Sequence, residues 1–353
     1  MSQAYSAEEE VAVAAVRRAS HLTSAVFNKL VKNETLTKGD KSPVTVGDFA
    51  AQAVISSMLK HAFPEDPIVG EEDAAELRIE SGKEMKDRIV ALANEALTEE
   101  LGLGDNQNWG IGPGQEKTDA EILDAIDRGN YEGGSSGRMW TIDPIDGTKG
   151  FLRGEQYAVC LSLIVDAQVQ VGVIGCPNLP IDPANPEKGT GVIFKAVRGQ
   201  GTHQLTLSGA NPTPLRIPPS TPSTLAFLES VEAAHSKLSF NDRVASLLGI
   251  IRPPVRMDSQ AKYGCLVRGE GGAYLRMPTG VGYREKIWDH APGHILVEEA
   301  GGVVTDSRGE PLNFGLGRTL GENYGVIAAG KDIHPLVLGA VQKALAEETK
   351  AKV

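Results

Sequence analysis

The sequence MWTIDPIDGTKGF, residues 139–151, is an apolar run that ends in two aspartates, Asp143 and Asp146. Burying one carboxylate at the end of a strand is costly, and burying two close together costs more unless cations neutralise them. Carboxylate ligands without cysteine or paired histidine are typical of Mg²⁺ or Mn²⁺ sites rather than zinc sites. Pro144 restrains the backbone between the aspartates, which leaves the carbonyl group of Ile145 free to point at a metal. The stretch therefore predicts a strand that leads into a divalent-metal site.

The residues that follow these aspartates suit an anion. Gly147 and Thr148 offer backbone N–H groups and a hydroxyl group, and Lys149 adds positive charge. Two divalent ions about 3.5–4 Å apart can activate water and bind the leaving oxygen in phosphate hydrolysis. Phosphatases that form an aspartyl-phosphate also carry paired aspartates after a strand, but their D-x-D-x-T motif has one residue between the aspartates where this sequence has two. The pattern therefore favours hydrolysis by metal-activated water.

Further acids lie where the sequence predicts that strands end or helices begin. Asp48 lies in the first turn of a helix predicted over about 47–62, and Glu71 and Glu72 follow a short strand in DPIVGEED. Asp289 comes just before a helix that begins in WDHAPG. Each of these acids could also be present for a reason unrelated to a metal. The helix macrodipole favours an acid such as Asp48 in a first turn, Glu72 can simply be a solvated surface residue, and Asp289 can be the N-cap of the helix that follows. Together with the two aspartates of the central motif, these acids predict one site assembled from separate segments.

The composition is that of an ordinary globular protein, with 353 residues, 41% hydrophobic, 23% charged and a formal net charge of −11. The negative charge argues against a nucleic-acid polymer as partner, although local cations can still bind a small anion. No apolar run approaches the roughly 18–20 residues that span a bilayer, and the N-terminus lacks a signal pattern. The 3 cysteines are far apart and outside CxxC spacing, which argues against zinc and disulfides. We therefore expect a cytoplasmic protein, by default a monomer, that has no membrane partner.

The pattern of apolar residues changes along the chain and divides it into two parts. Residues 6–32 predict an amphipathic helix, and residues 74–135 an acidic, helical insertion. Strands dominate the next part, including a hairpin in YAVCLSLIVDAQVQVGVIGC. After the proline-rich segment 211–224, strands and helices alternate. The sequence therefore predicts an α+β domain over 1–210 and an α/β domain over 211–353.

The chain resembles the lithium-sensitive, Mg²⁺-dependent phosphatases of the inositol monophosphatase superfamily. Three of their motifs occur in order: GEE (70–72), WTIDPIDGT (140–148) and WDHAPGHILVEEAGG (288–302). Within the superfamily the resemblance is strongest to the 3′(2′),5′-bisphosphate nucleotidases of the fungal salt-tolerance type. The segments that carry it are SPVTVGDFAAQ (42–52), NYEGG (130–134), DGTKGFLRGEQYAVCLSLIVD (146–166), GCPNLP (175–180), VEAAHS (231–236), DSQAKY (258–263), AYLRMP (273–278) and EKIWDHAPG (285–293). It covers essentially the whole chain apart from a few loops.

The resemblance implies an alternating α-β-α-β-α sandwich with the site between two domains. It implies two or three Mg²⁺ ions per site, with Mn²⁺ as a substitute, and makes Asp48 and Thr148 the pair that orients and deprotonates the attacking water. The implied metal ligands are the side chains of Glu71, Asp143, Asp146 and Asp289 and the carbonyl group of Ile145. The implied nucleotide-binding residues are Thr148, His235, Ser259, Lys262, Arg276 and Asp289.

The reaction implied by the resemblance removes the 3′-phosphate of adenosine 3′,5′-bisphosphate and gives AMP and phosphate. It extends to 3′-phosphoadenylyl sulfate, and with it to a role in sulfate assimilation and to inhibition by Li⁺ and Na⁺. An inositol phosphatase, including one that acts on inositol 1,4-bisphosphate, is the nearest alternative, and the segments DSQAKY and VEAAHS favour the nucleotide. A non-catalytic nucleotide or cation sensor on the same fold is a second alternative, against which the intact set of acids argues.

Overall fold

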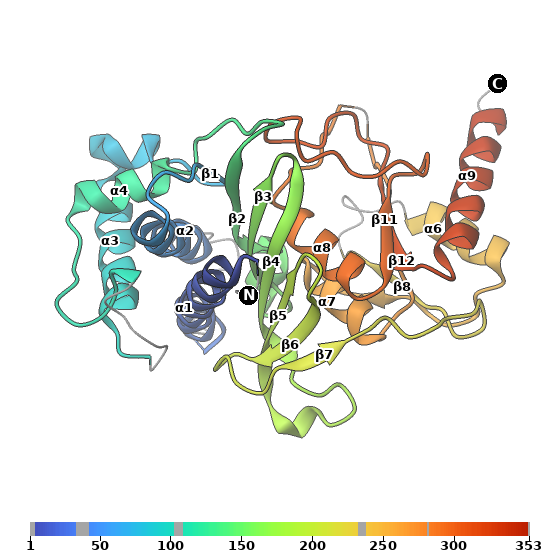
Figure 1. Cartoon of the computed structure of the whole chain (residues 1–353), viewed down its shortest axis with the longest axis horizontal. Helices are drawn as coiled ribbons and strands as arrows, with labels where there is room; N and C mark the ends of the chain where they lie inside the picture. The colour runs from blue at the N-terminus through green and yellow to red at the C-terminus, as the bar shows by residue number, and fades with distance from the viewer. Residues whose placement is uncertain (1–3, 33–41, 102–108, 232–237, 281, 352–353) are drawn as a thin grey trace.

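The computed structural model describes residues 4–32, 42–101, 109–231, 238–280 and 282–351. Sheets and layers of helices alternate along the long axis of the molecule (Figure 1). Helices α1 and α2 cover the outer face of the first sheet, α7 and α8 lie between the two sheets, and α6 and α9 cover the second sheet. This arrangement confirms the α-β-α-β-α sandwich expected from the sequence. The helices are α1 (Ser6–Lys32), α2 (Ser42–Ala62), α3 (Lys83–Thr98), α4 (Asp119–Asp127), α5 (Thr148–Arg153), α6 (Leu238–Leu248), α7 (Ala261–Arg268), α8 (Ala291–Glu299) and α9 (His334–Ala351).

Within the described ranges, the first sheet has seven strands in sequence order, and β1 runs parallel to β2 while the later neighbours pair antiparallel. Strand β3 is buried along nearly its whole length because helices cover both faces of the sheet. Asp166 and Ala167, both with positive φ, form the turn between β3 and β4, which confirms the predicted hairpin. The strands are β1 (Ile68–Gly70), β2 (Arg138–Asp146), β3 (Ala158–Val165), β4 (Gln168–Pro180), β5 (Thr190–Val197), β6 (Gly201–Thr206) and β7 (Thr213–Leu215).

The second sheet, as far as the structure describes the chain, has five strands in the order β11-β12-β10-β8-β9. Apolar side chains fill the space on both of its faces, with Tyr263 and Ile295 on the side of the first sheet and Phe240 and Val341 on the outer side. The carboxyl end of β2 and the start of α7 and α8 meet between the sheets, and this junction positions the candidate site described below. The strands are β8 (Phe227–Glu229), β9 (Val255–Arg256), β10 (Ala273–Arg276), β11 (Gly302–Thr305) and β12 (Val326–Gly330).

The structure corrects two expectations about helix ends. Helix α2 begins at Ser42 rather than near residue 47, so Asp48 lies in its second turn, beyond the main reach of the macrodipole. His290, not Asp289, is the residue at the N-cap of α8, and it makes no side-chain capping bond there. The simple explanations for both aspartates are therefore wrong.

The change of sheet falls between β7 and β8, and the division into two domains stays a prediction.

Candidate active site

A cavity of about 290 Å³ lies where the two sheets approach each other, and it collects most of the site residues predicted from the sequence. Residues of the first sheet and its loops meet there with residues from β10, α7 and the segment before α8. Asp48 lies next to the cavity wall, whereas His235 falls outside the described residues. The predicted residues that line the cavity are Glu71, Asp143, Ile145, Asp146, Thr148, Ser259, Lys262, Arg276 and Asp289.

The backbone at the end of β2 turns both aspartates toward this cavity. The register between β2 and β3 shifts between Asp143 and Asp146, so the strand is irregular where Pro144 lies. Gly147 then adopts a φ of +87°, and a Cβ atom on it would lie 3.0 Å from the Cβ atom of Ser259. A glycine is needed here both for its left-handed backbone and for the close approach of the two halves of the chain.

The acids carry unpaired oxygens in a buried setting. Asp143 is 2% exposed and Asp48 is 6% exposed, and among the described residues the Oδ1 atom of each has no hydrogen-bond partner. Burial, followed by the charge of Glu71, holds the pKa of both carboxyl groups well above the usual range. Burial also raises the pKa of Asp146 and Asp289, although Lys262 and Arg276 respectively oppose these shifts. Buried acids with orphaned oxygens fit a site for divalent cations, because cations supply the missing partners.

Ile145 connects the two residues that are expected to activate water. Its backbone N–H group donates to the carboxylate of Asp48, and its carbonyl oxygen accepts a hydrogen bond of 3.3 Å from the Thr148 hydroxyl. Thr148 therefore contacts Ile145 rather than Asp48 in this structure. A carbonyl oxygen has two lone pairs, so the Ile145 carbonyl can still serve a metal. The water-activating role of Asp48 and Thr148 stays a prediction.

Cationic groups face the acids across the cavity. Lys262 is 2% exposed, and its Nζ atom donates to the backbone carbonyls of Ser259 at 2.8 Å and Met257 at 3.1 Å. Burial lowers its pKa to about 8. The Nε atom of Arg276 lies 2.9 Å from Glu285, and its guanidinium group lies 3.6 Å from the carboxylate of Asp289. Acids that attract cations thus stand beside cations that attract an anion, as phosphate-ester hydrolysis requires.

Several supporting residues were not singled out from the sequence. The backbone N–H of Gln260 donates to Asp146 at 2.5 Å, and its side chain donates to the carbonyl of Trp288 at 2.8 Å. Glu285 accepts from Asn323 at 3.1 Å and lies 3.1 Å from His290. The other His290 nitrogen lies 2.8 Å from the Tyr263 hydroxyl, so His290 has no ring nitrogen left for a metal. The segments DSQAKY and EKIWDHAPG contain Gln260 and Glu285, respectively, and were usable signals for both residues.

Two arginines join the halves of the chain on either side of the site. Arg153 pairs with Glu155 at 2.9 Å and forms a close ion pair with Asp258, so its role in the structure is a cross-connection. Arg318 donates to the carbonyl groups of three first-half residues, and its guanidinium group lies 5.0 Å from the ring of Trp288, the residue before Asp289. Those acceptors are Gly70, Gly129 and Tyr131.

The fold is that of known phosphatases. An IMPase from Thermotoga maritima superposes with a TM-score of 0.57 at 19% identity, covering 95% of this chain and 97% of that one. CysQ from Bacteroides thetaiotaomicron, described as a bacterial member of the inositol monophosphatase family, superposes with a TM-score of 0.57 at 16% identity, covering 93% of this chain and 98% of that one. The model of the inositol monophosphatase family matches residues 5–346. The chain belongs to the inositol monophosphatase family and is a phosphatase.

Sequence relatives narrow the comparison further. The chain is 50% identical over 347 residues to a protein from Schizosaccharomyces pombe named 3′(2′),5′-bisphosphate nucleotidase, with 95% of each chain covered. It is 46% identical to a protein of the same name from Emericella nidulans, covering 97% of this chain and 99% of that one. A third protein with this name, from Oryza sativa, is 43% identical, with 99% of each chain covered. The resemblance seen in the sequence is confirmed.

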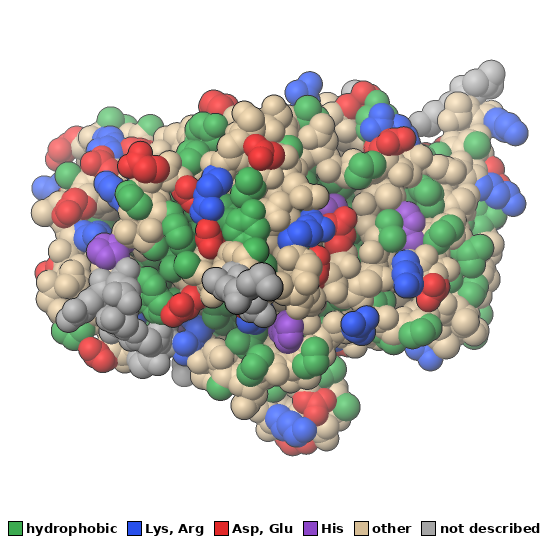
Figure 2. Space-filling view, in the orientation of Figure 1, with side chains coloured by type: hydrophobic (Ala, Val, Ile, Leu, Met, Phe, Trp, Pro, Cys, Tyr) green, Lys and Arg blue, Asp and Glu red, His purple; other side chains and the backbone are tan. Residues whose placement is uncertain are grey.

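The surface agrees with a small-molecule substrate. Figure 2 shows Lys, Arg, Asp and Glu side chains interspersed over one face of the molecule, without a continuous basic patch on that face. Within the described ranges, none of the helices combines the length and the apolar character needed to cross a bilayer.

The burial of the acids, together with the repulsion between them, predicts how the stability of the metal-free protein depends on pH. The pKa values of Asp48 and Asp143 are raised well above their usual range, and burial raises that of Glu72 to about 7. Acids titrate near pH 4 in an unfolded chain, so between about pH 4 and pH 7 the folded protein binds more protons than the unfolded chain. The free energy of unfolding contributed by these groups therefore falls as the pH rises. Glu285 and Glu298, with pKa values lowered to about 2, affect the stability only below this window. Burial lowers the pKa of His203, His290 and His334, so these three groups oppose the fall in the acid half of the pH scale.

Thermal unfolding in a metal chelator at pH 5.5 and pH 7.5 measures this effect. We expect the lower melting temperature at pH 7.5, and we expect added Mg²⁺ to raise it at pH 7.5 more than at pH 5.5. Because the histidines titrate alike in both proteins, the Asp143→Asn protein is the reference. A melting temperature in chelator that falls no more in the parent than in Asp143→Asn between the two pH values would show that the buried charge of Asp143 does not destabilise the metal-free protein.

Proposed function

We propose that this enzyme hydrolyses the 3′-phosphate of adenosine 3′,5′-bisphosphate, giving AMP and inorganic phosphate, with Mg²⁺ as the cofactor. The observation that supports the proposal most is that buried acids with unpaired oxygens and the cations Lys262 and Arg276 line one cavity. The names of the sequence relatives support the choice of a bisphosphate nucleotide.

In this proposal the metal ions are held by Glu71, Asp143, Asp146, Asp289 and the carbonyl group of Ile145. When bound, divalent ions supply an activated water molecule and neutralise negative charge that develops on the phosphate. The water oxygen attacks phosphorus in line with the bond to the 3′ oxygen, and that bond breaks to leave the nucleotide 3′-hydroxyl after protonation. No covalent enzyme intermediate forms.

The remaining residues bind the reactants and move a proton. Asp48 and Thr148, which meet at the backbone of Ile145, orient the attacking water and accept its proton. Ser259, Lys262 and Arg276 bind the nucleotide and its phosphates, with Thr148 and Asp289 beside the phosphate that is cleaved. The nucleotide-binding role predicted for His235 belongs to the same proposal, although His235 lies outside the described residues.

The finer properties expected from the resemblance are part of the same proposal. These are two or three metal ions per site with Mn²⁺ as a substitute, inhibition by Li⁺ and Na⁺ through replacement of one Mg²⁺, and hydrolysis of 3′-phosphoadenylyl sulfate. A cytoplasmic location, a monomeric state and a function in sulfate assimilation also remain proposals.

Phosphate release from adenosine 3′,5′-bisphosphate, AMP and inositol 1-phosphate, measured in parallel in Mg²⁺, tests the proposal. We expect fast release from the bisphosphate alone, because AMP keeps the 5′-phosphate but lacks the phosphate to be cleaved. Faster release from inositol 1-phosphate would favour an inositol phosphatase and overturn the roles given to Ser259, Lys262 and Arg276. Nucleotide binding without release would favour the sensor.

A further inference from the structure

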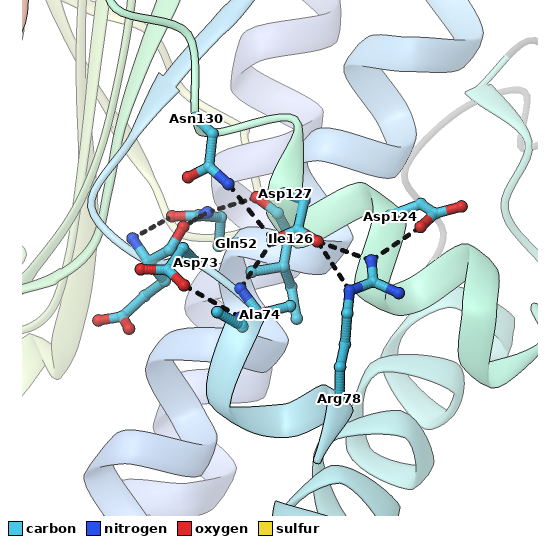
Figure 3. A network of polar contacts seen from close by, with 10 residues as sticks. Gln52, Asp73, Ala74, Arg78, Asp124, Ile126, Asp127 and Asn130 are labelled. Atoms are coloured by element: carbon cyan, nitrogen blue, oxygen red, sulfur yellow. Dashed lines mark hydrogen bonds and ion pairs between the residues drawn. The ribbon is translucent and has the colours of Figure 1, made fainter.

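Gln52 connects the helix that carries Asp48 to the segment that carries Glu71. Its side chain is fully buried, and its Oε1 atom accepts a hydrogen bond of 3.0 Å from the backbone N–H of Glu72. Its Nε2 atom donates to the carbonyl of Glu72 at 2.7 Å and to that of Ile126 at 2.9 Å. Figure 3 shows this amide between the two backbone segments. The Gln52 amide thus brackets Glu72, the residue that follows Glu71: it hydrogen-bonds to both its backbone N–H and its backbone carbonyl.

Through its position in α2, Gln52 links Asp48 to the backbone beside Glu71. Asp48 and Gln52 are one helical turn apart on the same face of α2. The Asp48 carboxylate reaches the site, where Glu71 raises its pKa, while Gln52 fixes the backbone directly after Glu71. A rigid helix therefore sets the distance between Asp48 and Glu71.

Two glycines let the backbone close around this amide. A Cβ atom on Gly70 would lie 2.7 Å from the Oε1 atom of Gln52, and one on Gly129 would lie 2.6 Å from its Nε2 atom. The N–H of Gly70 donates to the carbonyl of Gly129 at 2.8 Å, so the two segments are also joined to each other. The space around Gln52 is therefore shaped for an amide and for bare backbone.

Asp127, the last residue of α4, holds the residues that follow Glu72. The Oδ1 atom of Asp127 accepts from the N–H of Ala74 at 2.7 Å, and its Oδ2 atom pairs with Arg78 at 2.6 Å (Figure 3). Arg78 also binds Asp124 at 2.8 Å, which ties this segment to α4. The backbone is thus held before Glu71, where Gly70 bonds Gly129, and directly after it, where Glu72 bonds Gln52. These contacts set the direction in which the Glu71 side chain leaves the chain, and the bond at Ala74 holds the segment that follows.

We infer that Gln52 is a positioning residue of the metal site, which acts by holding the Glu71 carboxylate where a metal ion meets it. This inference rests on the proposed function, in which Glu71 is a metal ligand. Groups that orient a ligand from outside the coordination shell commonly change metal affinity by about 10- to 100-fold when they are removed. Gln52 differs from a merely stabilising residue in that its loss weakens metal binding, not only folding.

The experiment compares Gln52→Met with a matched control, Asn94→Leu. The Asn94 amide brackets the backbone of Lys117 in the same way, with bonds of 2.8 Å in both directions, but neither residue lines the cavity. Mn²⁺ binding to the substrate-free protein is measured by calorimetry, and thermal unfolding is measured in chelator. We expect Gln52→Met to raise the dissociation constant for Mn²⁺ by about tenfold or more, and Asn94→Leu to leave it unchanged.

Further variants distinguish a failure of the proposed function from a failure of the inference about Gln52. Glu71→Gln tests the proposed function itself, because Mn²⁺ affinity equal to that of the parent would remove Glu71 from the metal site. If Glu71→Gln weakens binding and Gln52→Met does not, only the inference about Gln52 fails. Should Gln52→Met not fold, Gln52→Asn keeps a buried amide but withdraws it from Glu72, and amide hydrogen exchange at Glu72 shows whether the bracket is lost. A folded Gln52→Asn protein with faster exchange at Glu72 and the affinity of the parent would overturn the inference.

Discussion

An Asp143→Asn enzyme is expected to release phosphate from adenosine 3′,5′-bisphosphate at least about a thousandfold more slowly than the parent, which corresponds to about 4 kcal/mol of lost transition-state stabilisation. Asn keeps the shape of the side chain but removes the negative charge that a divalent ion needs. The loss should persist at saturating Mg²⁺, since it concerns the reaction rather than metal occupancy alone. Steady-state kinetics in a series of Mg²⁺ concentrations measures both quantities.

The same substitution should stabilise the protein when no metal is present. Asp143 is buried and faces Glu71, Asp146 and Asp289, and its Oδ1 atom has no hydrogen-bond partner in the described part of the chain. Removing its charge therefore relieves repulsion. Asp306→Asn is the control, because the buried carboxylate of Asp306 binds Arg308 and backbone N–H groups away from the cavity. That control should lower the melting temperature and keep the activity. Activity of Asp143→Asn near that of the parent would contradict the proposed metal site.

Arg276→Met is expected to lower kcat/KM for the bisphosphate by about 100-fold, mostly through a higher KM. Charge-assisted hydrogen bonds contribute up to about 3 kcal/mol, and the guanidinium group of Arg276 lines the cavity on the side of Lys262. Its loss also leaves Asp289 without the cation that now lies 3.6 Å away, which should weaken binding of an anionic substrate further. Initial rates over a range of nucleotide concentrations separate KM from kcat.

Two other arginine variants serve as controls for Arg276→Met. Arg276→Lys keeps the charge but loses the planar fork, so its kcat/KM should lie between those of the parent and the methionine variant. Arg243→Met removes an arginine that pairs with Glu347 at 2.8 Å on the outer helices, and it should leave kcat/KM unchanged. Parent-like kinetics in Arg276→Met would exclude Arg276 from binding the nucleotide.

The central acids could be predicted because the information lies close together in the sequence. Asp143 and Asp146 follow an apolar strand within one short motif, and the cost of burying them is evident without a structure. The hairpin between β3 and β4 was equally local, since a turn joins two runs of strand-forming residues. The beginning of α2 was misplaced because the polar run that ends in SPVTVGD was assigned to a loop, although Pro43 is typical of a first helical turn.

The supporting contacts could not be predicted because their partners are distant in the chain. Gln52 meets Ile126 across 74 residues, and Arg318 meets Gly70 across 248 residues. A buried amide or a half-buried arginine has no sequence pattern of its own, since its partners are backbone groups that any residue supplies. The sequence therefore identified the groups that carry charge in the site but not the groups that hold them in place.

The two arginine connections described above bear on how substrate is exchanged. Arg318 ties the Gly70 segment to the residue before Asp289, and Arg153 ties α5 to Asp258 on the other side of the cavity. The cleft is thus preorganised, and a nucleotide that enters it loses its own freedom without first having to assemble the walls. These connections among the described residues do not have to form anew when substrate enters, so we infer that departure of phosphate from between the acids competes with the chemical step in setting the rate.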